Sequence, residues 1–203
     1  MKHTGVVAAL PADAADRLQI YAAALRHWNG RINLVSRADA ADLWHRHIAD
    51  CAQLAALLPD VPGDIVDLGS GAGLPGLVLA IVADRHVRLV ESDQRKAAFL
   101  REAARLTGAS VTVHAVRAQA LQVPPAAVVT ARALAPLPAL LPLAHRLLRP
   151  DGYGLFPKGR AAEDELTAAA NGWHMRVERF ASQTDAAATI LRISELRPVA
   201  TAA

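Results

Sequence analysis

The chain has 203 residues and a mass of 21.5 kDa, which suffices for one α/β domain with a modest extension but not for two separate cores. Its 53% hydrophobic and 20% charged residues exclude a disordered chain and a solvated coiled coil. The single cysteine excludes an internal disulfide and a multi-cysteine metal site, and the net charge of +3 permits a polyanionic partner without requiring one.

The first sixty residues are expected to form a helical extension. One apolar stripe at helical spacing consists of Leu18, Tyr21, Leu25 and Trp28. It predicts a helix that begins near Pro11. A second stripe, which predicts a second helix, consists of Leu43, His47, Cys51, Leu54 and Leu58. Ser36, with Asp39 three residues later, predicts the cap of that second helix, and Asn29-Gly30 predicts a turn between the two.

From residue 64 onward, apolar strand patterns alternate with helix patterns. The predicted strands are 64–68, 87–90, 111–116, 126–130, 153–156, 175–180 and 189–193. The predicted helices are 75–82, 95–106 and 137–148. This alternation predicts an open, mostly parallel sheet covered on both faces, with the last two strands as an antiparallel hairpin. We therefore expect one α/β domain over residues 61–203, with residues 1–60 packed on it.

The feature richest in chemistry is the segment 67–76, Asp67-Leu68-Gly69-Ser70-Gly71-Ala72-Gly73-Leu74-Pro75-Gly76, which joins the first strand to a helix. Alternating glycines let a backbone turn sharply and approach a ligand closely. Glu91 follows 22 residues after Gly69, at the end of the next strand, where an acid can bind ribose hydroxyls. The pattern predicts a site for an adenosine-containing cofactor at the carboxyl edge of the sheet.

Two cofactor classes fit these glycines. Gly71-x-Gly73-x-x-Gly76 matches the dinucleotide fingerprint, whereas Asp67-x-Gly69-x-Gly71-x-Gly73 resembles the S-adenosylmethionine methyltransferases. Asp67 favours the second class, because a carboxylate attracts a cationic sulfonium donor and repels a pyrophosphate. After residue 76 only 127 residues remain, which complete one sheet but add no substrate domain. A methyl donor is therefore the favoured cofactor, with a dinucleotide as the alternative.

The residues also constrain the acceptor atom. After the fourth strand the chain reads Thr130-Ala131-Arg132-Ala133, without the D/N-P-P-Y/F motif of enzymes that methylate amino groups of bases. Methylation of a pyrimidine carbon needs a thiolate nucleophile, and Cys51 lies in the extension instead. Guanine N7 needs neither device, because its lone pair attacks without loss of a proton. Methylation of oxygen or nitrogen in a small molecule also fits these residues.

Five segments, in order and at their spacing, make the chain resemble one family. They are Trp28-Asn29…Ile32-Asn33-Leu34, Arg46-His47-Ile48-Ala49-Asp50, residues 67–76, Arg132-Ala133-x-Ala135-x-Leu137, and Lys158-Gly159. The chain resembles, over nearly its whole length, the RsmG (GidB) family of bacterial 16S ribosomal RNA guanine-N7 methyltransferases. The resemblance implies a class I S-adenosylmethionine-dependent methyltransferase with a Rossmann-like sheet. It also implies that the acceptor is a guanine in the decoding region of the small subunit.

The resemblance implies cofactor contacts as well. They fall here on Gly69, Leu74, Ala118, Gln119 and Arg132. With the residues chosen from the glycine motif, the expected cofactor set is Asp67, Gly69, Gly71, Gly73, Leu74, Glu91, Ala118, Gln119 and Arg132. The chain departs from the family pattern at Gln119, where family members usually have Glu, and at Cys51, where they usually have Ser.

Positively charged side chains are the candidates for contact with the acceptor. Arg132 is expected beside the methionine carboxylate and the incoming base, or else paired with a surface acid. Lys158 is expected to contact an RNA phosphate or guanine O6. Arg31 and Arg160 are expected at an RNA-facing rim, or else as ordinary surface charge.

His47 and Asp50 lie three residues apart on one helix face. They are expected to dock the extension against the sheet, with a role of His47 in substrate binding as the alternative. Cys51 is expected to be a small buried residue, and no metal site is expected.

No membrane segment is expected, because the apolar run at residues 6–10 is short and the stretch 126–144 contains Arg132 and three prolines. We therefore expect a cytoplasmic monomer whose partner is 16S rRNA or the 30S subunit. The alternatives are a methyltransferase for small molecules and a non-enzymatic protein that binds S-adenosylmethionine.

Overall fold

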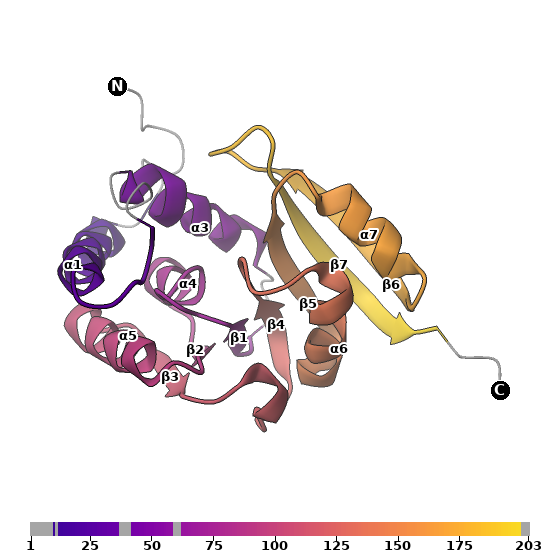
Figure 1. Cartoon of the computed structure of the whole chain (residues 1–203), viewed down its shortest axis with the longest axis horizontal. Coiled ribbons are helices and arrows are strands. Elements are labelled where there is room, and N and C mark those ends of the chain that lie inside the picture. Colours follow the sequence, from indigo (N-terminus) through magenta and orange to yellow (C-terminus); the bar gives the residue numbers. More distant parts are fainter. Residues whose placement is uncertain (1–9, 11, 37–41, 59–61, 200–203) are drawn as a thin grey trace.

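The computed structural model describes residues 10, 12–36, 42–58 and 62–199. Within them, seven strands form one sheet in the order β3-β2-β1-β4-β5-β7-β6 (Figure 1). The strands are β1 (Ile65–Leu68), β2 (Val87–Val90), β3 (Val111–His114), β4 (Ala126–Thr130), β5 (Leu148–Lys158), β6 (Trp173–Ala181) and β7 (Thr189–Pro198). The strands from β3 to β5 pair in parallel, whereas β7 runs antiparallel to both β5 and β6. The predicted sheet and its antiparallel hairpin are confirmed.

Helices cover both faces of this sheet, as Figure 1 shows. The α-helices are α1 (Ala12–Asn29), α3 (Asp50–Ala52), α4 (Gly76–Val82), α5 (Gln94–Thr107), α6 (Leu137–Leu147) and α7 (Ala162–Ala170). A π-helical turn, η2 (Trp44–Ala49), precedes α3, and 3₁₀ turns form at η3 (Gln53–Leu57) and η4 (Ala118–Ala120). One hydrophobic cluster lies between the sheet and α1, α4 and α5, and a second lies under α6 and α7.

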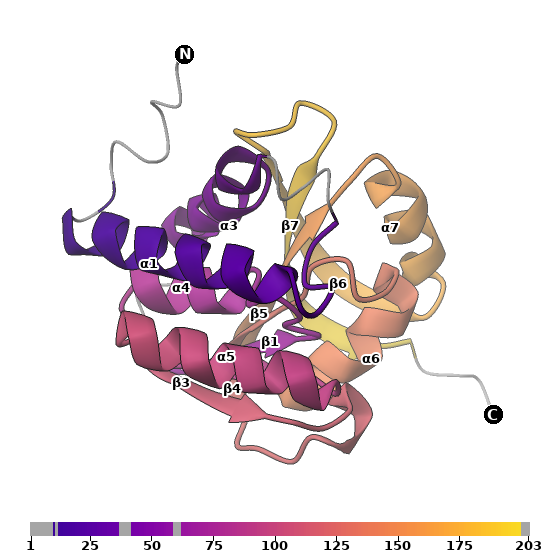
Figure 2. The ribbon, with the colours of Figure 1, turned by 60° about the vertical axis from the view of Figure 1, so that its left-hand side comes forward.

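The extension shares the first of these clusters with the sheet. Leu18 and Leu25 of α1 and Leu54 of η3 are fully buried in the cluster that also holds Ile65 of β1 and Val128 of β4. Helix α1 lies across α4 and α5, which separate it from the sheet (Figure 2). The extension is therefore an outer layer of the same core.

The predicted elements match those observed except at several boundaries. The second predicted helix is a π-helical, α-helical and 3₁₀ segment in succession. The prediction placed Pro75 at the first position of a helix, and the structure places it one residue earlier, as the cap of α4. The expected cap pair of Ser36 and Asp39 cannot be compared, since Asp39 lies outside the described residues.

Strand lengths also differ, since β3 ends two residues early and β5, β6 and β7 extend beyond their apolar runs. Helix α7 is absent from the prediction, although Glu163, Asp164 and Glu165 in its first turn are typical of a helix start.

The strand order fixes where a ligand can bind. Chain order runs β1-β2-β3 toward one side and β4-β5 toward the other, so the connections after β1 and β4 diverge at the carboxyl edge. In open α/β sheets, the crevice at such a switch point is the usual ligand site. The connection after β1 is the glycine turn, and the connection after β4 contains Arg132.

Candidate cofactor and acceptor sites

The glycine turn between β1 and α4 has the backbone shape that the motif predicts. Gly69, Gly71 and Gly73 have φ angles of 66°, 53° and 89°, in the left-handed region that side chains disfavour. A Cβ at Gly69 would lie 2.7 Å from Leu134 Cδ1, so the connection after β4 packs directly on the turn. The glycines therefore permit both the turn and this close approach.

Hydrogen bonds from the two neighbouring strands hold the turn. Gly71 N donates to Glu91 Oε2 at 2.9 Å, and Val90 N donates to Ser70 Oγ at 3.1 Å. Gly76 N, at the start of α4, donates to Asp67 Oδ2 at 3.2 Å. The shape of the turn is therefore built into the protein before any ligand arrives.

Asp67 is fully buried beneath the turn rather than in the pocket above it. Burial raises the pKa of its carboxyl to about 7, although hydrogen bonds from Ser70 and Gly76 oppose this shift. Its Oδ1 atom has no hydrogen-bond partner among the described residues. The structure thus gives Asp67 a bracing bond to Gly76, and any effect on a sulfonium would act through the turn.

A pocket of about 420 Å³ lies over the turn, and we call it the cofactor pocket after its candidate ligand. It is lined by Gly69, Gly71, Val90, Glu91, Ser92, Lys96, Val116, Arg117, Ala118, Gln119, Ala133, Leu134, Ala135, Ala139 and Leu143. The pocket brings together five of the nine predicted cofactor residues, namely Gly69, Gly71, Glu91, Ala118 and Gln119. The other four, Asp67, Gly73, Leu74 and Arg132, are not among its lining residues.

Glu91 has the geometry that a hydroxyl ligand requires. Its Oε1 accepts from Asp93 N at 2.8 Å and its Oε2 accepts from Gly71 N, which fixes the carboxylate at the pocket wall. Each carboxylate oxygen can accept a second hydrogen bond. The side chain can therefore hold the turn and still accept from the hydroxyls of a ribose.

A second pocket, of about 310 Å³, adjoins the first and shares Ala133 with it. We call it the acceptor pocket. Three distant segments line it: the extension, the connection after β4, and the adjoining ends of β5 and β7 with the β6–β7 loop. The lining residues are Arg46, His47, Asp50, Arg132, Ala133, Pro157, Lys158, Gly159, Ser182, Ala188, Thr189 and Ile190. It holds Arg132, His47 and Lys158 of the predicted acceptor residues.

Arg132 joins the sheet edge to the extension in this pocket. Its Nη1 donates to Asp50 Oδ2 at 2.9 Å, and both side chains are 19% exposed. Its Nη2 contacts His47 Nδ1, which must accept because a guanidinium only donates. The interpretation of His47 and Asp50 as docking residues is consistent with this contact, and the acid that Arg132 meets belongs to the extension.

Asp50 also ties the extension to the β6–β7 loop. Its Oδ1 accepts from Thr184 Oγ1 at 2.7 Å and from Gln53 Nε2 at 3.0 Å. Gln53 Oε1 in turn accepts from Gln183 N at 2.8 Å. Sequence reasoning missed Gln53 and Thr184, because partners 131 positions apart leave no local pattern.

Lys158 is held by internal partners at the end of β5. Its Nζ donates to Ala135 O at 2.9 Å and pairs with Glu165 Oε2 at 2.8 Å, and its side chain is 10% exposed. Glu165 also accepts from Leu137 N at 2.8 Å. Lys158 therefore braces the connection after β4 and brings positive charge to the acceptor pocket.

The remaining candidates lie outside both pockets. Arg31 and Arg160 are exposed, and neither lines the cofactor or the acceptor pocket. Cys51 is fully buried, and burial raises the pKa of its thiol to about 12, so it is no nucleophile. Across the described segments, no three His, Cys, Asp or Glu side chains gather as they would around a metal ion.

The sheet, the glycine turn and the adjoining acidic residue define the class I methyltransferase fold. Solved structures agree in fold: the ribosomal protein L11 methylase of Lactobacillus delbrueckii subsp. bulgaricus superposes with a TM-score of 0.61 at 17% identity, covering 74% of this chain and 78% of that one. The glycopeptide N-methyltransferase MtfA, complexed with S-adenosylmethionine, gives 0.60 at 12% identity, covering 73% and 93%.

Sequence comparisons then identify the family. The profile of the GidB family, rRNA small subunit methyltransferase G, matches residues 14–189. The chain is 61% identical to ribosomal RNA small subunit methyltransferase G of Rhodospirillum centenum over 92% of this chain and 86% of that protein. For the protein of the same name from Gluconobacter oxydans, the identity is 51%, with 91% and 95% covered.

This chain belongs to the rRNA small subunit methyltransferase G family. It is a methyltransferase with S-adenosylmethionine as its methyl donor, as the sequence predicts. None of the helices formed by the described residues is long and apolar enough to span a membrane.

Proposed function

We propose that this protein transfers the methyl group of S-adenosylmethionine to N7 of a guanine in 16S ribosomal RNA. The observation that carries the proposal is the junction of the two pockets at Ala133. One pocket has a backbone cradle and a carboxylate, which suit an adenosine. The other is lined by Arg46, Arg132 and Lys158, which suit an electron-rich base and its phosphates.

The cofactor pocket fits the methyl donor by the shape of its backbone. Gly71 leaves room at the turn, since a Cβ there would meet no atom closer than 3.7 Å, and Glu91 would accept from the ribose hydroxyls. Ala118 and Gln119 of η4 line the same pocket and would contact the adenine. Gly73, Leu74 and Asp67 would act from beneath by holding the turn. When bound, S-adenosylmethionine supplies an electrophilic methyl group on a sulfonium.

The acceptor pocket favours a nucleophile that loses no proton. The carboxylate of Asp50 accepts from Arg132, Thr184 and Gln53, and Nδ1 of His47 accepts from Arg132. A general base needs a lone pair within reach of the proton it removes. Asp50 Oδ1 already accepts two hydrogen bonds and His47 Nδ1 accepts one, while the Arg132 guanidinium beside Asp50 Oδ2 disfavours protonation of that oxygen. Attack by guanine N7 needs only alignment with the methyl group, which rigid walls provide.

In this proposal Arg132 and Lys158 orient the base from the acceptor pocket. The exposed Arg31 and Arg160 would contact RNA phosphates at the rim. Each phosphate contact adds about 0.7 to the slope of log affinity against log salt on single-stranded RNA. Arg31→Ala and Arg160→Ala should therefore flatten this slope, and an unchanged slope would remove them from the rim.

The test is to incubate the protein with labelled S-adenosylmethionine and three substrates that lack the modification: 30S subunits, 70S ribosomes and naked 16S rRNA. We expect label on at least one of them, at a guanine whose N7 methylation makes the chain cleavable under mild reduction and aniline treatment. Label at another atom would contradict the N7 assignment. Label on none of the three would contradict the RNA substrate and favour a small acceptor molecule.

We also propose that the protein works in the cytoplasm, because an rRNA substrate is found there with the ribosome. We propose that it acts there as a monomer, since both pockets are formed within one chain. Light scattering during the labelling assay measures this directly, and a dimer as the active species would contradict it.

A further inference from the structure

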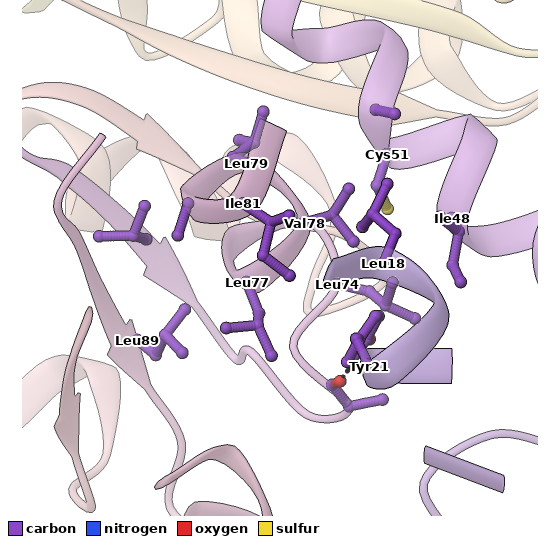
Figure 3. Close-up of a cluster of buried hydrophobic side chains, with 14 of the residues drawn as sticks. Leu18, Tyr21, Ile48, Cys51, Leu74, Leu77, Val78, Leu79, Ile81 and Leu89 are labelled. Atoms are coloured by element: carbon purple, nitrogen blue, oxygen red, sulfur yellow. Dashed lines mark hydrogen bonds between the residues drawn. The ribbon is translucent and has the colours of Figure 1, made fainter. Parts of the chain in front are cut away.

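Tyr21 connects the extension to the glycine turn. Tyr21 belongs to α1, and its ring is fully buried in the cluster of apolar side chains that also contains Leu18, Leu74 and Cys51 (Figure 3). Its hydroxyl donates to the carbonyl oxygen of Ala72 at 2.7 Å. Ala72 is the middle residue between two glycines of positive φ, so the bond reaches the centre of the turn.

This bond fixes one peptide unit of the turn at both ends. The carbonyl of Ala72 is held by Tyr21, and the N–H of Gly73 on the other side of that peptide donates to Ser70 O at 2.6 Å. The other hydrogen bonds described above, which involve Glu91, Ser70 and Asp67, join the turn only to itself and to the strands beside it. The bond from Tyr21 comes from 51 positions earlier in the chain, so it depends on the docked extension.

The surroundings keep the phenol neutral and able to donate. Burial raises the pKa of Tyr21 well above its usual value, and the nearby Cys51 and Asp67 act in the same direction while Arg132 opposes them. A buried carbonyl that loses its donor loses a hydrogen bond that water cannot replace. The turn then regains freedom at the peptide next to Gly71, which lines the pocket.

We propose that Tyr21 is a positioning residue for the methyl donor, which makes cofactor affinity depend on the extension. It touches neither pocket and acts only through the Ala72–Gly73 peptide. The proposal concerns the cofactor pocket alone, so it stands independently of the guanine acceptor.

The chain offers a matched control, since it contains just two tyrosines. The hydroxyl of Tyr153 in β5 donates to Leu57 O in η3, also at 2.7 Å, and so also joins the sheet domain to the extension. Tyr21→Phe and Tyr153→Phe therefore remove the same group and the same kind of bond, and both keep the ring that fills the core. They differ in whether that bond reaches the glycine turn and in burial, since Tyr21 is fully buried and Tyr153 is half-buried.

The experiment measures the dissociation constant of S-adenosylhomocysteine by calorimetry, with no RNA present. A lost hydrogen bond of about 1 kcal/mol corresponds to about a fivefold change in an equilibrium constant. We expect Tyr21→Phe to raise the dissociation constant about fivefold and Tyr153→Phe to leave it within twofold. Urea midpoints should fall for both variants.

Two further readouts separate positioning from general weakening. With Tyr21→Phe, KM for S-adenosylmethionine should rise while kcat at saturating donor stays within twofold. Hydrogen exchange at the amides of Gly71 and Gly73 should accelerate in this variant and not in Tyr153→Phe. Equal affinities for the two variants, or an affinity loss that follows the urea midpoint in both, would overturn the proposal.

Discussion

The cofactor pocket and the acceptor pocket meet at Ala133 but are built in different ways. The cofactor pocket rests on one continuous turn, residues 69–76, whose hydrogen bonds run to the next strand. The acceptor pocket is assembled from side chains that lie 82 and 134 positions apart, as in the pairs of Asp50 with Arg132 and with Thr184. The first site depends on backbone shape, to which the extension adds the bond from Tyr21, whereas the extension itself forms a wall of the second.

The largest expected effect comes from removing the Arg132 side chain, which should disable the acceptor pocket and leave the cofactor pocket intact. Arg132→Met leaves the Asp50 carboxylate without a cation at a site where each side chain is 19% exposed. Breaking a mostly buried ion pair lowers the free energy of unfolding by about 3 kcal/mol. The loss is somewhat smaller here, because water screens part of the attraction between the two charges. We expect methylation of RNA to fall about a hundredfold, while S-adenosylhomocysteine binds within threefold, by single-turnover assay and calorimetry.

Arg179→Met is the control for Arg132, since Arg179 pairs with Glu163 where both side chains are largely exposed. It should leave methylation unchanged, because exposed pairs contribute about 0–1 kcal/mol and this one is remote from both pockets. If Arg132→Met weakened cofactor binding as much as methylation, Arg132 would belong to the cofactor site, as the family resemblance implies.

A smaller effect is expected from adding a methyl group at Gly71, in the glycine turn. A Cβ at Gly71 meets no atom closer than 3.7 Å, and one at Gly108 meets none within 4 Å. The φ angles are also similar, 53° and 63°. Gly71→Ala and Gly108→Ala should therefore each lower the free energy of unfolding by about 1 kcal/mol through backbone strain.

The two alanine variants should differ in ligand affinity. Gly71 lines the cofactor pocket and Gly108 caps α5 far from it. We expect Gly71→Ala to raise the dissociation constant of S-adenosylhomocysteine about tenfold, a loss of about 1.4 kcal/mol, and Gly108→Ala to leave it unchanged. Calorimetry that finds equal affinities would show that the pocket over the turn is not where the cofactor binds.

The last test concerns stability alone, through pH and the buried carboxyl beneath the turn. The pKa of Asp67 rises from 3.8 to about 7 on folding, so the folded state binds its proton more tightly than the unfolded chain. This contribution to stability is full below pH 4 and is lost as the pH rises through 7. Between pH 5 and 8 the loss is on the order of 2 to 3 kcal/mol.

Asp67→Asn removes this titration while the amide oxygen can still accept from Gly76. Urea unfolding at pH 5 and pH 8 should show a smaller decrease in stability for the variant than for the natural protein. Parallel pH profiles would mean that Asp67 does not titrate in this range.

Features formed by local contacts could be predicted from the sequence, whereas those formed by contacts between distant segments could not. The glycine turn and Glu91 are specified within one strand–turn–helix–strand unit, so spacing alone predicted Gly69, Gly71 and Glu91, which line the pocket over the turn. Leu134 was missed, although it packs on Gly69 and is 41% exposed, because the contact joins the connections after two different strands. No periodicity in the sequence records such a contact.

The acceptor pocket shows more clearly what could not be predicted from the sequence. His47, Asp50, Arg132 and Lys158 were named from motifs, but their pairings across the fold were not. The pairs of Arg132 with Asp50 and of Lys158 with Glu165 form only when the chain has folded. The π-helical turn at Trp44–Ala49 was also not predicted, because the apolar spacing was compared only with the 3.6 residues per turn of an α-helix. Docking of the extension, rather than local propensity, determines these features.

The single residue shared by the two pockets has a consequence for inhibitor chemistry. Ala133 carries no side chain beyond its methyl group and holds a left-handed backbone with φ 54°. A compound that joins an adenosine-like head to a purine through a short tether would pass Ala133, the residue common to the two spaces of about 420 and 310 Å³. Both halves then bind through one linker, so their affinities reinforce each other through effective concentration.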